Sequence, residues 1–280
     1  MMELLGAPVA NAVCETLRAD VEALRFRGVS PRLAIVRVGE RDADLSYQRG
    51  ATKRMEKVGI DVEVCALRVD ASQEDLERAL TELDARDDVH GILLMRPLPA
   101  HMDEARAREL VSAAKDVDGM CAVNVAKVAE GDMDGFAPCT PEAVVTLLDH
   151  YGIAIDGSRV CVIGRGSVVG RPLASLLLAR NATVTLCHSH TRDVAEETRG
   201  ADIVVAAVGS PRFVNARMVT LGATVIDVGI NVDEDGHLCG DVESDSVRDV
   251  AGALTPVPRG VGSVTTSILA AHVVRAARNA

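Results

Sequence analysis

The sequence predicts an α/β protein of two lobes, an N-terminal α/β lobe and a C-terminal Rossmann-type lobe, with a cleft between them. Three observations lead to this prediction. Apolar runs of strand type alternate with helical patterns over residues 32–95, and a second alternation starts at Arg159. A connecting helix separates the two arrays, and a glycine-rich turn follows the first strand of the second array. Alternating strands and helices are typical of a parallel sheet covered by helices, so each array should form its own sheet.

The first array follows a helix that begins at Pro8 and is closed by Gly28. Helices are then expected around Tyr47–Val58, over residues 72–86 and near residues 103–114. Glycine just past the end of a helix suits the left-handed backbone that often terminates it. The strands of this array are expected at 32–38, 61–69 and 89–95.

The connecting helix begins at Thr140, an N-cap residue that is followed by proline at the first helical position. A hairpin is expected at Asp235 and Gly236, and the last segment, 263–279, has the apolar spacing of an amphipathic helix. The strands of the second array are expected at 160–164, 182–187, 202–209, 223–229 and 253–258.

Residues 159–170, RVCVIGRGSVVG, predict a site for a dinucleotide. A short apolar run is followed by Gly164, Gly166 and Gly170, and Pro172 opens the next helical pattern. Glycines let the backbone approach a pyrophosphate, and the unpaired N–H groups and dipole of a helix N-terminus favour its charge. The spacing is one residue longer than that of the common dinucleotide fingerprint, and a plain tight turn is the alternative interpretation.

The residues after the strand at 182–187 favour NADP over NAD as the cofactor. A site for NAD usually carries Asp or Glu here to accept a hydrogen bond from the ribose 2′-hydroxyl, whereas this chain has CHSH. Arg165 in the glycine loop supplies a cation that can bond a 2′-phosphate bidentately. We therefore expect Arg165 and Ser189 around the 2′-phosphate. The alternative is a solvated Arg165 and a turn-forming Ser189.

Composition and charge exclude several classes of function. The 280 residues suffice for two domains, and 48% hydrophobic with 25% charged residues is ordinary for a globular protein. A net charge of −11 argues against a nucleic-acid partner, which needs clustered Lys and Arg. No apolar run approaches the length of a membrane span, and no signal-peptide layout is present, so we expect a cytoplasmic protein without membrane attachment.

The cysteines and histidines predict no metal site. The seven cysteines include no C-x-x-C pair, and most lie in apolar segments, which favours reduced core thiols. His188 and His190 would point to one face of a strand, but two ligands without nearby support make a poor metal site.

Short motifs along nearly the whole chain resemble those of the methylenetetrahydrofolate dehydrogenase/cyclohydrolase family, in the family's order. They are VGERDADLSY (38–47), HGILLMRPLP (90–99), KDVDG (115–119), PCTP (138–141), GRGSVVGRP (164–172), ATVTLCHS (182–189), DVGIN (227–231), GDV (240–242) and TPVPRGVG (255–262). The resemblance implies a homodimeric enzyme that oxidises 5,10-methylenetetrahydrofolate to the methenyl form with NADP. Many members then hydrolyse that product to 10-formyltetrahydrofolate.

The resemblance also implies the domains and the site residues. The expected folate-binding catalytic domain is residues 1–140, completed by the terminal helix 264–280, and the expected NADP-binding domain is residues 141–263. A lone amphipathic helix must bury its apolar face, which supports its return to the first lobe. Tyr47 matches the family tyrosine that lies against the folate, and Asp118 matches the aspartate that anchors the pterin. The positions that match NADP contacts of the family are Gly164, Arg165, Ser189 and Ile230.

The chain departs from the family at its catalytic lysine and glutamine. Ala51 stands four residues after Tyr47, where the family has lysine, and Met95 replaces the glutamine of V-Q-L-P. Lys53 lies about 240° round the helix from Tyr47 and faces away, whereas Arg54 returns to the same face about 10 Å further along. The other departures are Asp44, where the family has serine, and Arg259, which interrupts the first glycine pair of P-V-P-G-G-V-G.

These replacements affect the two half-reactions differently. Hydride transfer needs close, aligned reactants but no protein acid or base, because the folate nitrogens stabilise the developing cation. Addition of water needs groups that take and deliver protons, and Ala51 and Met95 can do neither. We therefore expect a dehydrogenase with weak or absent cyclohydrolase activity.

Three other functions are alternatives: a bifunctional enzyme with a rewired base, an enzyme for a different reduced C–N substrate, and a folate- or nucleotide-binding pseudoenzyme. Asp44 or a cation near Arg259 could take over the task of the lysine in the first of these. Arg96 and Arg259 are interpreted as loop cations, with contact to the folate glutamate tail or to NADP as the alternative.

Overall fold

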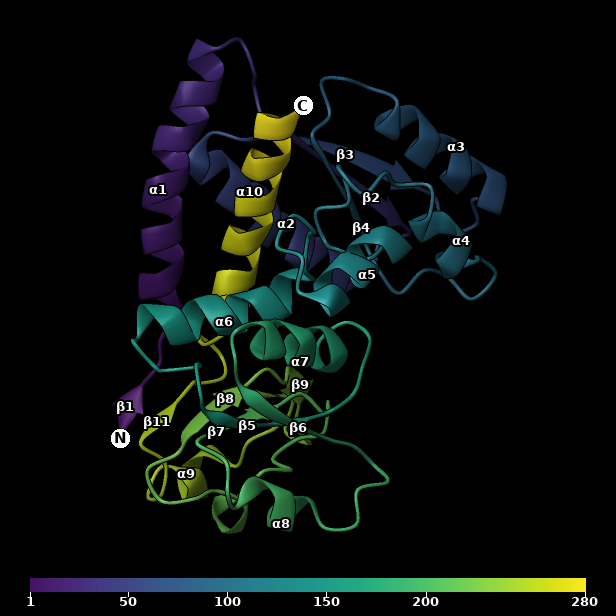
Figure 1. The fold of residues 1–280 in the computed structure, drawn as a ribbon. Helices are drawn as coiled ribbons and strands as arrows, with labels where there is room; N and C mark the ends of the chain where they lie inside the picture. The colour runs from purple at the N-terminus through teal and green to yellow at the C-terminus, as the bar shows by residue number, and fades with distance from the viewer. The chain divides into compact units, whose positions relative to one another are not determined.

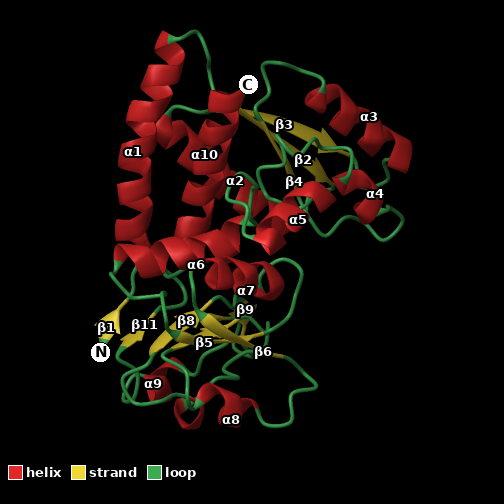
Figure 2. Cartoon of the chain, in the orientation of Figure 1, coloured by secondary structure: helices red, strands yellow, loops and turns green.

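The computed structural model describes residues 1–280, which form two compact units (Figure 1). The three-stranded unit contains residues 12–127, 132–139 and 266–280. The six-stranded unit contains residues 1–11, 128–131 and 140–265. Each unit combines helices with a parallel sheet, which confirms the predicted α/β class and the two separate strand arrays (Figure 2).

The sheet of the three-stranded unit has the order β3-β2-β4, and both neighbouring pairs are parallel. Its central strand β2 (Arg32–Val38) is buried along nearly its whole length, as expected where helices cover both faces of a sheet. Helices α2 (Asp42–Val58) and α3 (Gln73–Asp84) connect β2 to β3 (Asp61–Leu67) and β3 to β4 (Gly91–Leu94), so the predicted βαβαβ order is confirmed.

The helix expected near residues 103–114 is much shorter in the structure. Helix α4 spans only Glu104–Arg108, and a turn at residues 109–110 follows it. The backbone N–H and the hydroxyl of Ser112 both donate to Oδ1 of Asp84, at 2.9 and 2.8 Å. Asp116 then forms a parallel bridge with Ile92 of β4, which places the following turn beside the sheet. Helix α5 (Ala122–Glu130) follows that turn.

Long helices begin and end the chain. Helix α1 (Gly6–Phe26) starts two residues earlier than expected, and α10 (Gly262–Asn279) ends the chain. From residue 266 onward α10 belongs to the three-stranded unit. A Cβ atom on Gly91 would lie 3.0 Å from Val273, so the glycine that opens β4 allows this helix to approach the sheet closely.

The sheet of the six-stranded unit has the order β1-β11-β8-β7-β5-β6, with every neighbouring pair parallel. The chain runs from β5 outward to β6 and then returns to β7 on the other side of β5. The carboxyl ends of the strands at such a reversal are where open α/β sheets bind ligands. The strands are β1 (Met2–Glu3), β5 (Arg159–Ile163), β6 (Thr183–Cys187), β7 (Ile203–Ala206), β8 (Thr224–Asp227) and β11 (Ala253–Leu254).

Two features of this unit lie outside the regular alternation. Strand β1 was not expected, because its two residues carry no local pattern and depend on pairing with β11. The expected hairpin is confirmed: β9 (Asn231–Val232) pairs antiparallel with β10 (Leu238–Cys239), and Gly236 in the turn has φ 81°. The helical segments are α6 (Cys139–His150), α7 (Gly170–Ala179), α8 (Val194–Thr198), α9 (Ser244–Val247) and the 3₁₀ turn η1 (Ala216–Met218).

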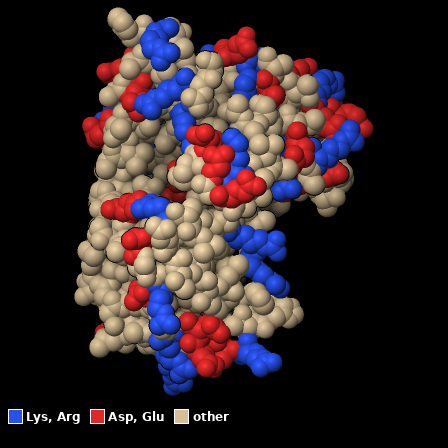
Figure 3. Space-filling view, viewed as in Figure 1, with Lys and Arg blue, Asp and Glu red and all other residues tan.

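The surface carries mixed charge. On the face that Figure 3 shows, acidic side chains lie among the basic ones, and no continuous basic field of the kind that binds nucleic acid is visible. No helix of the structure has both the length and the apolar character that crossing a membrane requires.

Candidate functional site

Tyr47 and Asp118 lie close enough in the three-stranded unit to influence each other's charge. Tyr47 is on α2, and burial raises the pKa of its phenol well above the usual value, with the charges of Cys139 and Asp118 adding to the effect. The phenol therefore stays protonated and neutral near pH 7. A neutral phenol can pack and donate a hydrogen bond, but it cannot take a proton.

A tight turn after β4 holds Asp118. Gly119 adopts φ 63°, and a Cβ atom there would lie 2.2 Å from the Phe136 carbonyl oxygen, so glycine is required. Asp116 fixes the start of the turn, because its carboxylate accepts the N–H of Cys121 at 2.8 Å and the amide of Asn124 at 3.0 Å.

The Asp118 carboxylate has a partner on each oxygen. Oδ1 accepts the backbone N–H of Cys139, and Oδ2 accepts Nη2 of Arg96, both at 3.5 Å. Burial raises the pKa of Asp118, the Arg96 guanidinium opposes that shift, and the charge of Asp116 adds to it. Arg96 lies in the loop after β4, as interpreted from the sequence, but its side chain is only 14% exposed and is paired with Asp118.

The two positions at which the sequence resemblance leads us to expect a lysine and a glutamine are buried and apolar. Ala51 lies on α2 one turn after Tyr47 with no exposed surface, and Met95 is 7% exposed. Lys53 is exposed, as the helical geometry predicts. Arg54 donates to the Thr266 hydroxyl at 3.3 Å and to the Cys14 sulfur at 3.5 Å, so its guanidinium is directed to α1 and α10.

Asp44 also has its own partner. Its carboxylate is 5% exposed and accepts two hydrogen bonds from Arg41, Nε to Oδ2 at 2.7 Å and Nη2 to Oδ1 at 2.9 Å. The Asp44 carboxylate, at the position expected to match the family serine, is therefore engaged in an ion pair within the protein.

The glycine loop of the six-stranded unit forms the predicted turn between β5 and α7. A Cβ atom on Gly164 would lie 2.0 Å from the Ala207 carbonyl oxygen, and one on Gly170 would lie 1.8 Å from that of Gly164. Gly166 differs, because no atom lies within 4 Å of its missing side chain. Two glycines thus close the turn, and the third leaves the backbone open to a ligand.

This loop borders a cavity of about 590 Å³ at the carboxyl ends of β5, β6 and β7. The structure brings Arg165 and Ser189, which lie far apart in the sequence, to the same cavity. No carboxylate lines it, and burial together with the charges of Arg165 and His190 lowers the pKa of His188. The hydrogen-bond donors and the Arg165 cation here suit a phosphate, as the sequence predicts. The lining includes Gly164, Arg165, Gly166, His188, Ser189, Thr191, Ser210 and Phe213.

Two buried aspartates support the loops of this region without lining the cavity, and we did not single them out from the sequence. The Asp241 carboxylate accepts the backbone N–H groups of Val208, Gly209 and Ser210 at 2.6, 3.0 and 3.0 Å, which fixes the loop after β7. Asp227 at the end of β8 accepts the backbone N–H of Asp241 at 3.0 Å. The motifs DVGIN and GDV contain both residues and were the available signal.

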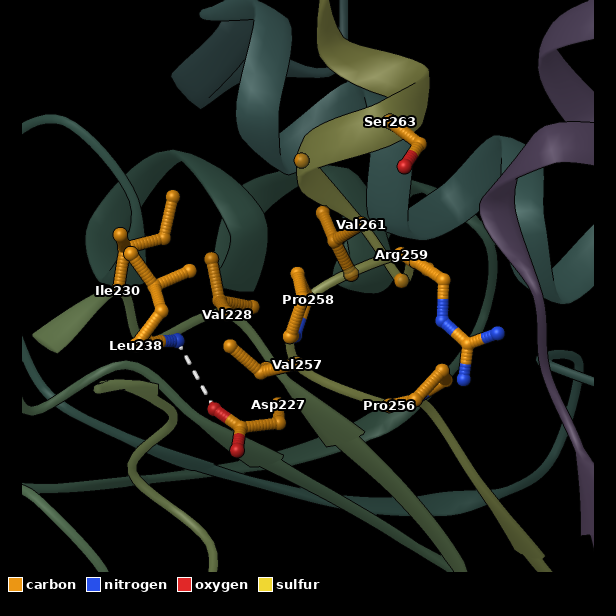
Figure 4. Close-up of a pocket in the computed structure, with 13 residues that line it drawn as sticks. Asp227, Val228, Ile230, Leu238, Pro256, Val257, Pro258, Arg259, Val261 and Ser263 are labelled. Atoms are coloured by element: carbon orange, nitrogen blue, oxygen red, sulfur yellow. Dashed lines mark hydrogen bonds between the residues drawn. The ribbon is translucent and has the colours of Figure 1, made fainter.

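A second cavity of about 240 Å³ in the same unit contains Ile230 and Arg259 in its lining (Figure 4). Arg259 has φ 84°, a left-handed backbone conformation that is unfavourable in free energy for any residue with a Cβ atom. Figure 4 shows its guanidinium beside Pro256, on the side away from Ile230 and Leu238. Ile230 is 68% exposed, which leaves its side chain available to a ligand.

A group of possible metal ligands occurs in the β9–β10 turn, where Asp233, Asp235 and His237 offer atoms within 4.8 Å of one another. The Asp233 carboxylate already has partners within the protein: it accepts hydrogen bonds from the backbone N–H groups of Asp235 and His237 and forms an ion pair with Arg212. His188 and His190 lie with ring centroids 6.0 Å apart, and the backbone N–H of His190 donates to Nδ1 of His188.

Comparison with known proteins relates both units to one family. Residues 4–118 match the family described as tetrahydrofolate dehydrogenase/cyclohydrolase, catalytic domain, and residues 138–280 match its NAD(P)-binding domain. The bifunctional protein FolD of Clostridioides difficile is 50% identical over 273 residues, which cover 98% of this chain and 95% of that protein.

Solved structures show the same fold. The crystal structure of the bifunctional enzyme FolD from Campylobacter jejuni has a TM-score of 0.97 at 36% identity and covers 100% of this chain and 99% of its own. That of Trypanosoma brucei methylenetetrahydrofolate dehydrogenase-cyclohydrolase, complexed with NADP cofactor and inhibitor, has a TM-score of 0.94 at 36% identity, covering 100% and 98%.

Proposed function

This chain belongs to the tetrahydrofolate dehydrogenase/cyclohydrolase family, and we propose that it is an NADP-dependent 5,10-methylenetetrahydrofolate dehydrogenase with little or no cyclohydrolase activity. The observation that carries the second part of the proposal is the apolar, buried character of positions 51 and 95. The family places lysine and glutamine there, and Ala51 and Met95 offer no ionisable or hydrogen-bonding side chain.

The residues of the larger cavity fit NADP. The open backbone at Gly166, next to the tight turn at Gly164, suits the close approach of a pyrophosphate. Arg165 is exposed and forms no ion pair within the protein, so its guanidinium is available to a 2′-phosphate, with Ser189 on the same cavity wall. Ile230, which lines the smaller cavity of the same unit, is also proposed to contact NADP. NADP, when bound, supplies the hydride acceptor.

Tyr47 and Asp118 are proposed to hold the folate. A neutral phenol offers a flat apolar surface and one hydroxyl, which suits contact with a ring system. The Asp118 carboxylate is the natural acceptor for the N–H groups of a pterin. These residues orient the substrate and exclude water, which is what hydride transfer requires of the protein.

Hydrolysis lacks its proton carriers in this site. Water addition needs a base near the attacking water and an acid near the departing nitrogen. The ionisable neighbours that could replace the lysine are engaged: Asp44 with Arg41, and Arg54 with Thr266 and Cys14. This supports loss of the second half-reaction over the bifunctional alternative with a rewired base.

Several further features stay proposals that rest on the family. They are the homodimer, the catalytic domain of residues 1–140 with 264–280, and the NADP domain of residues 141–263. We place the protein in the cytoplasm on the same ground.

The test is a spectroscopic assay of the purified protein with 5,10-methylenetetrahydrofolate and NADP. We expect NADPH and methenyltetrahydrofolate to form together, and the methenyl absorbance to persist after NADPH formation stops. NADP binding without turnover of any folate would contradict the proposal and favour a binding pseudoenzyme. Turnover of another reduced C–N compound in place of the folate would favour the alternative substrate.

A further inference from the structure

Arg96 places a cation within the proposed folate site. It is the second residue after β4, next to Met95, and its guanidinium has three neighbours. Nη1 donates to Oε1 of Glu104 at 3.4 Å, and Nη2 contacts Oδ2 of Asp118 at 3.5 Å and the sulfur of Met120 at 3.1 Å. A side chain held at three points and 14% exposed is part of the site rather than of the solvated surface.

Asp118 needs this cation. The groups that face its carboxylate are Tyr47 from α2, Cys139 from the start of α6, Asp116 from its own turn, and Arg96. Among them Arg96 alone carries a positive charge. A buried carboxyl without a cationic partner takes up a proton rather than remain charged. A protonated Asp118 would lose part of its capacity to accept N–H groups.

We propose that Arg96 is a positioning residue for the folate: it holds the Asp118 carboxylate ionised and oriented, so that the pterin N–H groups find an acceptor. The proposal rests on the proposed function, because it assigns Asp118 to folate binding. The guanidinium works through Asp118 and does not release a proton at neutral pH, so it supports binding without replacing the lost lysine in hydrolysis.

The direct test is the titration of the Asp118 carboxyl carbon by NMR, in protein labelled with ¹³C at its aspartate carboxyls. An Asp118→Asn variant identifies the signal. An opposite charge within about 4–6 Å lowers a carboxyl pKa by about 1–3. We therefore expect Arg96→Met to raise the Asp118 midpoint by about 1 pH unit or more. Arg96→Lys, which keeps the charge, should restore most of the difference.

Arg106→Met is the matched control, because it removes an arginine of α4 whose guanidinium pairs with Glu77 at 2.6 Å and does not contact Asp118. It should leave the midpoint of Asp118 in place. An unchanged midpoint in Arg96→Met would overturn the proposal. If that variant does not fold, the same titration of Arg96→Gln decides: a raised Asp118 midpoint supports the proposal, and an unchanged one overturns it.

Kinetics provide a second readout. Below the new Asp118 midpoint, Arg96→Met should raise the KM for methylenetetrahydrofolate about tenfold or more and leave the KM for NADP unchanged, and the difference should disappear as the pH rises past that midpoint. A purely structural defect would not recover with pH. The NMR titration needs no turnover, so an inactive intact protein with the expected titration overturns the proposed function alone. An active protein with an unchanged midpoint overturns the role of Arg96 alone.

Discussion

Replacing Arg165 by alanine should weaken NADP binding far more than NAD binding. Arg165 is exposed, forms no ion pair and lines the same cavity as Ser189, so its guanidinium is available to the 2′-phosphate. A hydrogen bond to a charged group contributes about 1.5–3 kcal/mol, and each 1.4 kcal/mol is tenfold, so the Kd for NADP should rise about 10- to 150-fold. NAD loses only the weak attraction of an exposed cation for the pyrophosphate, about 0–1 kcal/mol.

The assay is calorimetric titration of the protein with each cofactor at about pH 8, where an ordinary imidazole is neutral. This pH matters because Arg165 lowers the pKa of His188. At lower pH, removal of Arg165 would let His188 become protonated, and its positive charge would partly replace that of Arg165. Arg199→Ala is the matched control, since Arg199 is exposed, does not line the cavity and donates to the Ala195 carbonyl of α8. Equal losses for NADP and NAD in Arg165→Ala would refute the assignment of Arg165 to the phosphate.

Three other perturbations have defined outcomes. Replacing Ala51 by lysine together with Met95 by glutamine should recover part of the ~10²–10⁴-fold contribution of acid–base catalysis to hydrolysis. The control, Ala51→Met, should not recover it. Equal rates of methenyl decay in the double variant and the control would argue against the missing lysine as the cause. Arg259→Gly should raise the free energy of unfolding in urea by about 0.5–1 kcal/mol, because the left-handed backbone favours glycine; a loss of stability would show that the Arg259 side chain makes a stabilising contact. Burial raises the pKa of Asp227 to about 6, so the folded state binds its proton more tightly than the unfolded state. The stabilisation from that proton is complete below about pH 4 and is lost as the pH rises through about 6, a change of about 3 kcal/mol in the free energy of unfolding. Asp227→Asn should remove this pH dependence from urea titrations made across the range. An equal slope of unfolding free energy against pH in both proteins would contradict the prediction.

Local patterns accounted for the regular part of the fold. The buried central strand β2 and the glycine turn after β5 were predictable because apolar alternation and glycine spacing are properties of neighbouring residues. Strand β1 was not, because its two residues become a strand only by pairing with β11, which is distant in the chain. Helix α4 was predicted to be too long, and Ser112, which lies in the range expected to be helical, instead donates to Asp84, 28 residues earlier in the chain.

The same distinction applies to the sites. Helical geometry alone predicted that Lys53 faces away from Tyr47, and the structure agrees. The contact between Arg96 and Asp118 joins residues 22 positions apart through a tight turn, and no local pattern indicates it. Asp241 was missed for a similar reason, since its role is to collect the backbone N–H groups of a loop from another part of the sheet.

The central claim is that this chain transfers hydride but does not hydrolyse the product. The most direct test supplies 5,10-methenyltetrahydrofolate to the unmodified protein without NADP and follows the loss of its absorbance against protein-free buffer. Our account predicts decay at the spontaneous rate, independent of protein concentration, from the same preparation that forms NADPH with methylenetetrahydrofolate. Rapid, saturable decay proportional to protein concentration would contradict the claim and show that another group performs the task of the lysine at position 51.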